Sequence, residues 1–197
     1  DLELLDGAAL TRVALIAEGV SAHASMPHLG VNALYAANCA MQAANALRES
    51  FKDDEHIRFH PIITQGGAAV NAIPDHVVTE AYLRGATMES IARENKKVNR
   101  ALTGAALSLG AQIEIVDIPG YAPLYNAPGM TTACLEAASA ILPDHTVEYK
   151  PFGNGSTDMG DLSAVMPVVH PYVGGAVGTE HGNNYYIADV RSACTGS

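Results

Sequence analysis

A histidine and an arginine stand in settings where their side chains could bind a substrate. His23 lies between small residues in Gly19–Pro27 (GVSAHASMP), on a loop that leaves a strand, so a substrate or another chain could approach it. Arg84 shares a sheet face with Tyr82 and Glu80 by strand alternation. A guanidinium on that face could hold a carboxylate in a forked pair.

Taken one at a time, these residues also fit plainer interpretations. His23 alone is typical of a surface histidine in a strand-to-helix connection, and Arg84 could simply pair with Glu80 on a solvated face. Asn71, in the segment VNAIPD (70–75), is a third candidate for binding, but it is also typical of a turn. Asn tolerates left-handed backbone angles and Pro presets φ.

Two polar loops further along the chain supply the remaining candidates. Ser156, Thr157 and Asp158 lie in GNGSTDMGD (153–161), where no lysine follows the glycines, so a nucleotide site is not predicted. Ser156 is also outside the G-x-S-x-G elbow of serine hydrolases, and no cysteine has a setting typical of a nucleophile. His181, in GTEHGNNY (178–185), could bind a metal, although a surface loop is the plainer interpretation.

Composition and charge exclude several classes of partner. Eleven basic and 21 acidic side chains give a net charge of -10, and no basic run exceeds Lys96–Lys97, so neither nucleic acid nor an anionic membrane is an expected partner. The three cysteines are widely spaced and form no C-x-x-C pair, so a disulfide framework is not predicted. This cysteine usage predicts a protein of the reducing cytoplasm. No signal peptide or membrane span is predicted, and the start at Asp1 suggests a processed product or a piece of a longer protein.

Hydrophobic periodicity predicts a first domain over residues 8–119. Alternating and Ala-rich stretches predict strand, helix, strand, strand, helix and strand, at residues 14–18, 30–48, 57–64, 77–84, 88–109 and 112–118. This βαββαβ order is that of a ferredoxin-like sandwich.

Residues 120–197 show a different pattern. A helix at 130–142, a short strand near Val147, a glycine-rich loop and a hydrophobic strand at 165–173 are predicted there. These elements are too few to close a domain by themselves. The predicted fold class is therefore α/β (α+β), with a complete first domain and an incomplete second one.

The motifs taken together resemble a known enzyme family. A strand followed by GVSAHASMP, then NAIP, a strand with Arg84, GSTD and a late histidine is similar to the amidohydrolase branch of the zinc aminoacylase/carboxypeptidase family of metallopeptidases. Within that branch, the chain most resembles aminobenzoyl-glutamate hydrolase-like proteins over residues 10–185. The resemblance implies a dimerising lid over residues 8–119 and, at 120–197, a C-terminal portion of the catalytic domain.

The resemblance also implies an activity and a role for each candidate. It implies a homodimeric enzyme that uses one or two Zn²⁺ ions, or other divalent metals, to cleave an amide bond of an N-acyl amino acid, an aminobenzoyl-glutamate-like compound or a dipeptide. On this resemblance His23 would stabilise the oxyanion in the partner subunit's site, and His181 would be a metal ligand. The residues that would bind or border the substrate are Asn71, Arg84, Ser156, Thr157 and Asp158.

The sequence departs from the family pattern in the chemistry itself. A catalytic zinc requires about three protein ligands and a nearby general base, but His-x-Asp, Cys-Gly-His, Glu-Glu and H-E-x-x-H motifs are all absent. The chain by itself is therefore expected to be inactive. The alternative hypothesis is a non-enzymatic ferredoxin-like module for dimerisation or for binding a small carboxylate. An upstream reading frame with the missing ligands would distinguish the two.

Overall fold

The computed structural model describes residues 1–144 and 146–188. Contacts divide the chain into two compact units: unit 1 combines residues 1–7 with the chain from residue 124 onward, and unit 2 comprises residues 8–123. Among the described residues, no helix is long and apolar enough to cross a lipid bilayer.

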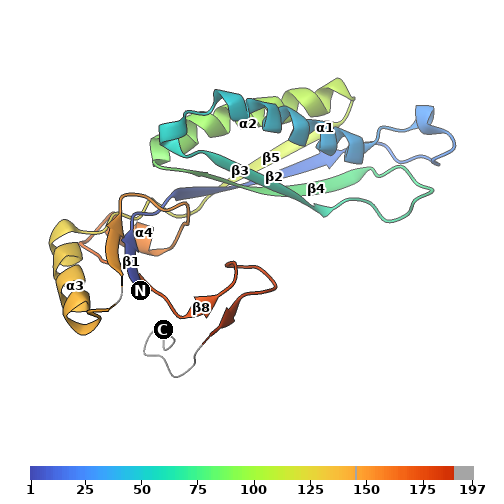
Figure 1. Ribbon diagram of the computed structural model, residues 1–197. Helices are drawn as coiled ribbons and strands as arrows, with labels where there is room; N and C mark the ends of the chain where they lie inside the picture. The colour runs from blue at the N-terminus through green and yellow to red at the C-terminus, as the bar shows by residue number, and fades with distance from the viewer. Residues whose placement is uncertain (145, 189–197) are drawn as a thin grey trace. The chain divides into compact units, whose positions relative to one another are not determined.

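Unit 2 is a four-stranded antiparallel sheet with two helices on one face (Figure 1). The spatial order of the strands is β3-β4-β2-β5. In chain order the elements are β2 (Ala9–Glu18), α1 (Ala33–Ala46), β3 (Arg58–Gln65), β4 (His76–Gly85), α2 (Met88–Ser108) and β5 (Gln112–Pro119). The predicted ferredoxin-like βαββαβ fold is confirmed.

The hydrophobic core of unit 2 lies between the sheet and the helices. Leu83 of β4 is fully buried, Val13 and Leu15 of β2 are almost so, and all three belong to one core cluster with Val98 of α2. Helix α1 buries a stripe of alanines, at positions 33, 36, 37, 40 and 44. Such small side chains allow the helix to approach the sheet closely, and the opposite face of the sheet carries no helix (Figure 1).

Side-chain caps define where both helices begin. Asn32 caps α1, because its side-chain oxygen accepts a hydrogen bond from the Tyr35 main-chain N–H at 3.1 Å. Thr87 and Ser90 form a reciprocal capping box at the start of α2. The helix predicted at 30–48 is therefore shorter, since Asn32 is its cap and Leu47–Ser50 forms a 3-10 turn.

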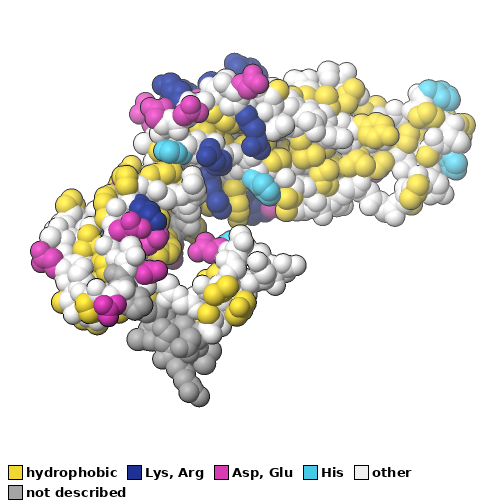
Figure 2. All heavy atoms as spheres, viewed as in Figure 1, with side chains coloured by type: hydrophobic (Ala, Val, Ile, Leu, Met, Phe, Trp, Pro, Cys, Tyr) yellow, Lys and Arg dark blue, Asp and Glu magenta, His cyan; other side chains and the backbone are white. Residues whose placement is uncertain are grey.

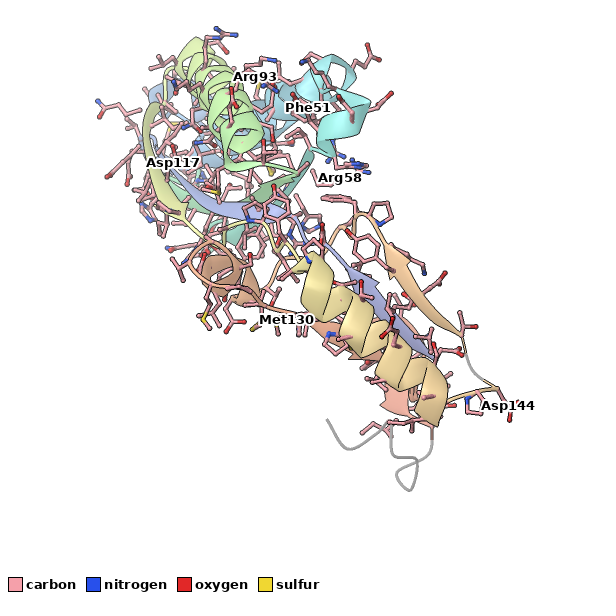
Figure 3. All side chains as sticks on the ribbon, turned by 90° about the vertical axis from the view of Figure 1, so that its left-hand side faces the viewer. Phe51, Arg58, Arg93, Asp117, Met130 and Asp144 are labelled. Carbon is pink, nitrogen blue, oxygen red and sulfur yellow. The ribbon has the colours of Figure 1, made fainter. Side chains whose placement is uncertain are left out.

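A buried carboxylate of α2 is paired with two cations of the same helix. Glu94 is 1% exposed and accepts hydrogen bonds from Arg93 and Lys97, each at 2.9 Å. Burial tends to raise the pKa of Glu94, but the bonds from Lys97 and Arg93 prevail and lower it. Arg93, labelled in Figure 3, also pairs with Glu55. The pKa of Arg93 is raised, first by its bond to Glu94.

Helix α2 is also bonded to edge strand β5. Asp117 accepts hydrogen bonds from the amides of Asn95 and Asn99, each at 2.7 Å (Figure 3). The two amides lie four residues apart, so they project from the same side of the helix toward one carboxylate. This contact fixes the end of β5 against α2.

Unit 1 is built around strand β1 (Leu2–Leu5), which the sequence interpretation did not predict. Strand β1 pairs in parallel with β6 (Val147–Lys150) and antiparallel with β7 (Pro171–Val173). Its core residues Leu2 and Leu4 pack against Ala138 of α3 (Pro128–Ile141). Helix α4 (Met159–Ser163) and the hairpin strands β8 (Ala176–Val177) and β9 (Tyr186–Ile187) complete the elements described for this unit.

The hydrophobic strand predicted at residues 165–173 is wrong over most of its length. Only Pro171–Val173 is a strand. Val165 and Met166 follow α4 in a turn and are 80% and 55% exposed, respectively. A short apolar run does not define a strand without a neighbouring strand to pair with.

Candidate functional site

Two loops meet at one end of the unit 2 sheet. One connects β2 to α1 (residues 19–32) and the other connects β3 to β4 (residues 66–75). Their main chains are joined by hydrogen bonds from Gly19 N to Asp75 O (2.7 Å), from Ala24 N to Asn71 O (3.0 Å) and from Ile73 N to Ala22 O (2.9 Å). The first loop therefore pairs with the second like a short strand, with His23 opposite Ala72.

The first loop is closed at its base by a close approach that only glycine permits. Val20 and Val31 exchange two main-chain hydrogen bonds of 2.9 Å. A Cβ at Gly19 would lie 2.1 Å from the Val31 carbonyl oxygen, and one at Gly30 would lie 2.7 Å from the Val20 oxygen. Both glycines are therefore required by lack of space, and the loop they close presents His23.

The ring of His23 is held by its own turn. The main-chain N–H of Met26 donates to the His23 carbonyl at 2.8 Å, which closes the turn. The hydroxyl of Ser25 lies 2.8 Å from His23 Nδ1, and the main-chain N–H of Ser25 donates to the same nitrogen at 3.2 Å. His23 is exposed, and no hydrogen bond joins its Nε2 to the described residues. That nitrogen is free to bind a substrate.

An open cleft of about 520 Å³ lies between the loops and is lined by Ala24 and Ala72, the sequence neighbour and the bridge partner of His23, but not by His23 itself. Small side chains and main chain line most of it, including Ala24, Ala72 and the segment 66–70. Several large apolar residues of this end are exposed to solvent, namely Val20, Met26, Leu29, Tyr35 and Val70. Figure 2 shows hydrophobic and histidine side chains together at this end of unit 2. Such a surface is typical of one that another chain or a substrate covers.

Asn71 lies beside His23, whereas Arg84 does not. The side chain of Asn71 is exposed on the second loop, and its carbonyl receives the bond from Ala24 that joins the loops. Arg84 lies at the far end of β4, nine residues beyond Asp75, or about 30 Å along the strand. Unit 2 therefore brings together two of its three predicted substrate-contacting residues, His23 and Asn71.

The surroundings of Arg84 differ from the plainer sequence interpretation. Arg84 shares the helix-free face with Tyr82 and Glu80, as alternation predicted, and its guanidinium lies 5.7 Å from the Tyr82 ring. The pairing with Glu80 considered above is wrong, because Glu80 pairs with Arg12 of the neighbouring strand β2. The Nε atom of Arg84 is buried without a hydrogen-bond partner in the described structure.

The loop of Ser156, Thr157 and Asp158 precedes α4 in unit 1. The Thr157 hydroxyl bonds to the Asp158 carboxylate at 3.1 Å and accepts a 3.4 Å hydrogen bond from the Met159 main-chain N–H. The Ser156 hydroxyl is buried without a partner among the described residues. Thr157 thus bonds to the first turn of α4, Asp158 is the N-cap residue without a side-chain capping bond, and the Ser156 hydroxyl is buried.

Asp6 and Asn126 join distant segments of unit 1 by hydrogen bonds, and sequence reasoning missed both. Asn126 is 7% exposed, bonds through its main chain to the Asp6 carboxylate at 2.9 Å, and accepts from His170 N at 2.8 Å. The Tyr149 hydroxyl donates to Asp6 at 3.1 Å; burial and then the Asp6 carboxylate raise the pKa of Tyr149. No local motif marks these residues, which lie 120 positions apart.

His181 occupies an exposed turn between β8 and β9, with a left-handed φ of 60°. Residues 1–144 and 146–188 contain no group of three or more His, Cys, Asp or Glu side chains that could hold a metal ion. A structural or catalytic zinc site requires at least three such ligands. The described residues therefore do not form a metal site by themselves, and His181 could contribute one ligand at most.

Comparison with known proteins identifies the family. A model of the peptidase dimerisation domain matches residues 8–108, which make up half of the chain. The chain belongs to the M20 family of peptidases and amidohydrolases. The family expected from the order of the motifs is thus confirmed.

Individual M20 relatives are hydrolases. A Xaa-Arg dipeptidase of Mus musculus is 33% identical over 163 residues, covering 78% of this chain and 36% of the relative. Among solved structures, aminopeptidase PepT of Bacillus cereus ATCC 10987 covers 94% of this chain and 48% of its own, with a TM-score of 0.67 at 22% identity. The match to an aminobenzoyl-glutamate utilization protein of Klebsiella pneumoniae covers 82% of this chain and 42% of that protein, with a TM-score of 0.61 at 21% identity.

These matches leave much of each relative unmatched. The chain spans 36% to 43% of the length of the curated relatives it matches. At 22% and 21% identity, the two structural matches establish the fold alone. The family model matches the ferredoxin-like unit 2, and the individual matches extend beyond it to 78% of this chain in the Xaa-Arg dipeptidase and 94% in aminopeptidase PepT.

Proposed function

We propose that this chain supplies the lid, and part of the catalytic domain, of a homodimeric metal-dependent amidohydrolase or peptidase. The proposed substrate is a small amide with a carboxylate near the scissile bond: an N-acyl amino acid, an aminobenzoyl-glutamate-like compound or a dipeptide. The dipeptidase relative and the acidic charge, which disfavours nucleic acid, support this choice.

The observation that carries the proposal is the way His23 is presented. Two loops joined by main-chain hydrogen bonds hold this histidine at the end of the dimerisation domain, beside a cleft and among exposed apolar side chains. A hydrogen-bond donor in a fixed position can stabilise the oxyanion of a tetrahedral intermediate. His23 is therefore the proposed oxyanion donor, and Asn71 beside it the proposed contact to the substrate carbonyl.

The other candidate residues complete the proposal. Arg84 is proposed to bind the substrate carboxylate, because Glu80 on the same face pairs with Arg12 and leaves the Arg84 guanidinium without that carboxylate partner. The segment 156–158 is proposed to border the substrate, and His181 to be one metal ligand. The remaining ligands of one or two Zn²⁺ ions, and the general base, are proposed to lie outside residues 1–144 and 146–188.

Replacement of His23 tests the proposal in the protein encoded by the complete reading frame. His23→Ala should lower turnover by about two to three orders of magnitude, the usual effect of removing an oxyanion donor, without changing the metal content or the oligomeric state. His28→Ala is the matched control, because His28 lies in the same loop without a hydrogen bond to the described residues. A fully active His23→Ala enzyme would show that His23 is a surface loop residue without a catalytic role.

Subunit mixing tests whether His23 acts in its own subunit or across the dimer. His23→Ala subunits mixed with His181→Ala subunits should form some heterodimers in which one site has both an intact metal ligand and an intact His23. These mixtures should recover activity that neither parent has. Failure of every mixture to recover activity would place the function of His23 within one subunit.

The proposal extends to oligomeric state and compartment. A homodimer through unit 2 is supported by the dimerisation-domain match and by edge strands β3 and β5, which adjoin only one strand each within the sheet. A cytoplasmic location is supported by the free thiols of Cys39 and Cys134. The alternative, a non-enzymatic dimerisation or carboxylate-binding module, would leave hydrolysis absent from the complete protein.

A further inference from the structure

His23 has two hydrogen-bonding contacts on one ring nitrogen, and both come from Ser25. The Ser25 hydroxyl lies 2.8 Å from Nδ1, and the Ser25 main-chain N–H donates to Nδ1 at 3.2 Å. A hydroxyl can donate or accept, but a main-chain N–H can only donate. Nδ1 must therefore carry a lone pair in this arrangement, because a proton on Nδ1 would point at the N–H of Ser25 and two donors would face each other.

We propose that Ser25 is a positioning residue that holds neutral His23 as the tautomer with its proton on Nε2. A neutral imidazole carries its proton on one nitrogen only, so an acceptor at Nδ1 leaves the donor at Nε2. The Ser25 hydroxyl then donates to Nδ1 as well. The catalytic consequence rests on the function proposed for His23, whereas the tautomer itself is a property of this chain alone.

The turn around Ser25 makes this arrangement durable. The Met26 N–H bonds to the His23 carbonyl, and the neighbouring Ala24 N–H bonds to Asn71 of the second loop. These bonds fix the main chain on both sides of Ser25, so its N–H cannot easily turn away from the ring. The imidazole of His23 is therefore oriented by its own turn, which the pairing of the two loops holds in place.

The tautomer decides what His23 can do for a reacting amide. An Nε2–H group can donate to a developing oxyanion, whereas the other tautomer would present a lone pair to that negative charge. In many enzymes a histidine is oriented by a bond to its second ring nitrogen, and the partner there is commonly a carboxylate or carbonyl that selects Nδ1–H. Ser25 supplies donors instead and so selects the opposite tautomer.

Nitrogen NMR of the chain with ¹⁵N-labelled histidine tests the tautomer directly. Spectra are recorded at a pH of about 8.5, where an ordinary imidazole is neutral, and the His23 signals are assigned by their loss in His23→Gln. We expect an acceptor-type shift for Nδ1 and a protonated-type shift for Nε2. His28 in the same loop, with no recorded partner among the described residues, is the internal control and should show exchange between tautomers. A His23 signal protonated at Nδ1 would overturn the proposal.

Substitution of Ser25 separates its hydroxyl from its main chain. Ser25→Ala keeps the N–H donor but removes the hydroxyl, so the preference for the Nε2–H tautomer should weaken without being lost. The His23 shifts should move part of the way toward those of an exchanging imidazole, and Ser25→Thr should restore the wild-type shifts. In the complete enzyme, Ser25→Ala should lower kcat about three- to tenfold with little change in KM, as expected for one lost orienting hydrogen bond. Unchanged ¹⁵N shifts in Ser25→Ala would refute the role of the hydroxyl.

A double variant keeps this inference apart from the proposed function. In a His23→Ala background, Ser25→Ala should have no further effect on kcat, because Ser25 acts through His23. An additional loss in that background would refute the positioning role. If His23→Ala by itself leaves the enzyme fully active, the proposed function fails, while the NMR spectra still decide whether Ser25 fixes the tautomer.

Discussion

Substitution of Gly19 by alanine should open the loop that presents His23. The added Cβ would lie 2.1 Å from the Val31 carbonyl oxygen, whereas carbon and oxygen in close contact are normally about 3.3 Å apart. The obstructing atom belongs to the main chain, so the two loop ends must separate by roughly 1 Å. That movement breaks both main-chain hydrogen bonds between Val20 and Val31.

The expected loss is about 2 kcal/mol, because each of the two hydrogen bonds contributes about 1 kcal/mol. Overpacking of comparable sites costs about 1–3 kcal/mol, which agrees. The urea midpoint of unit 2 should fall by about 1 M, given a denaturant slope of about 2 kcal/mol/M. Hydrogen exchange of the β2 and β4 amides measures unit 2 separately from unit 1.

Gly104→Ala is the matched control for this experiment. Gly104 lies on the exposed side of α2, and a Cβ there would meet no atom within 4 Å. Alanine should stabilise that helix by about 0.5–1 kcal/mol. If Gly19→Ala unfolds at the wild-type midpoint while Gly104→Ala is stabilised, the lack of space at Gly19 is not what closes the loop.

Further predictions concern stability, metal binding and assembly. Because the pKa of Glu94 is lowered in the folded chain, its contribution to stability is present above its ordinary pKa of about 4.3 and is lost as the pH falls through the lowered value. Glu94→Gln should therefore have a lower urea midpoint than the wild type at pH 7, and the two should converge in acid. Leu83→Ala should cost about 2–5 kcal/mol by urea unfolding, because Leu83 is fully buried in the core; a loss below about 1 kcal/mol would show that the core collapses around the cavity. Calorimetry should find weak zinc binding without fixed stoichiometry, since the described residues contain no three-ligand group, and a tight one-to-one site would contradict this. Sedimentation should find a dimer, and a monomer at high concentration would count against the dimerisation proposed for unit 2.

Local patterns in the sequence determined the elements of unit 2 and the family. Strand β4 and helix α1 are each buried on one side only. Buried side chains therefore recur about every second residue in the strand and every three to four residues in the helix, and this repeat is visible in the sequence. The motif around His23 is also contiguous, so its position on a loop after a strand could be predicted. These features depend on neighbours within a few residues, which a sequence displays directly.

Tertiary structure decided the features that depend on distant partners. Strand β1 exists because residues 2–5 find partners near positions 147 and 171, and no local pattern specifies that pairing. The bonds from Ala24 and Ile73 join loops about 50 residues apart, which places Asn71 beside His23 and leaves Arg84 at the opposite end of β4. Ser25 stood in the recognised motif, yet only the folded turn brings both of its donors to Nδ1. Pairing over long separations depends on three-dimensional geometry, because the hydrogen bonds form wherever the folded chain brings donors and acceptors together.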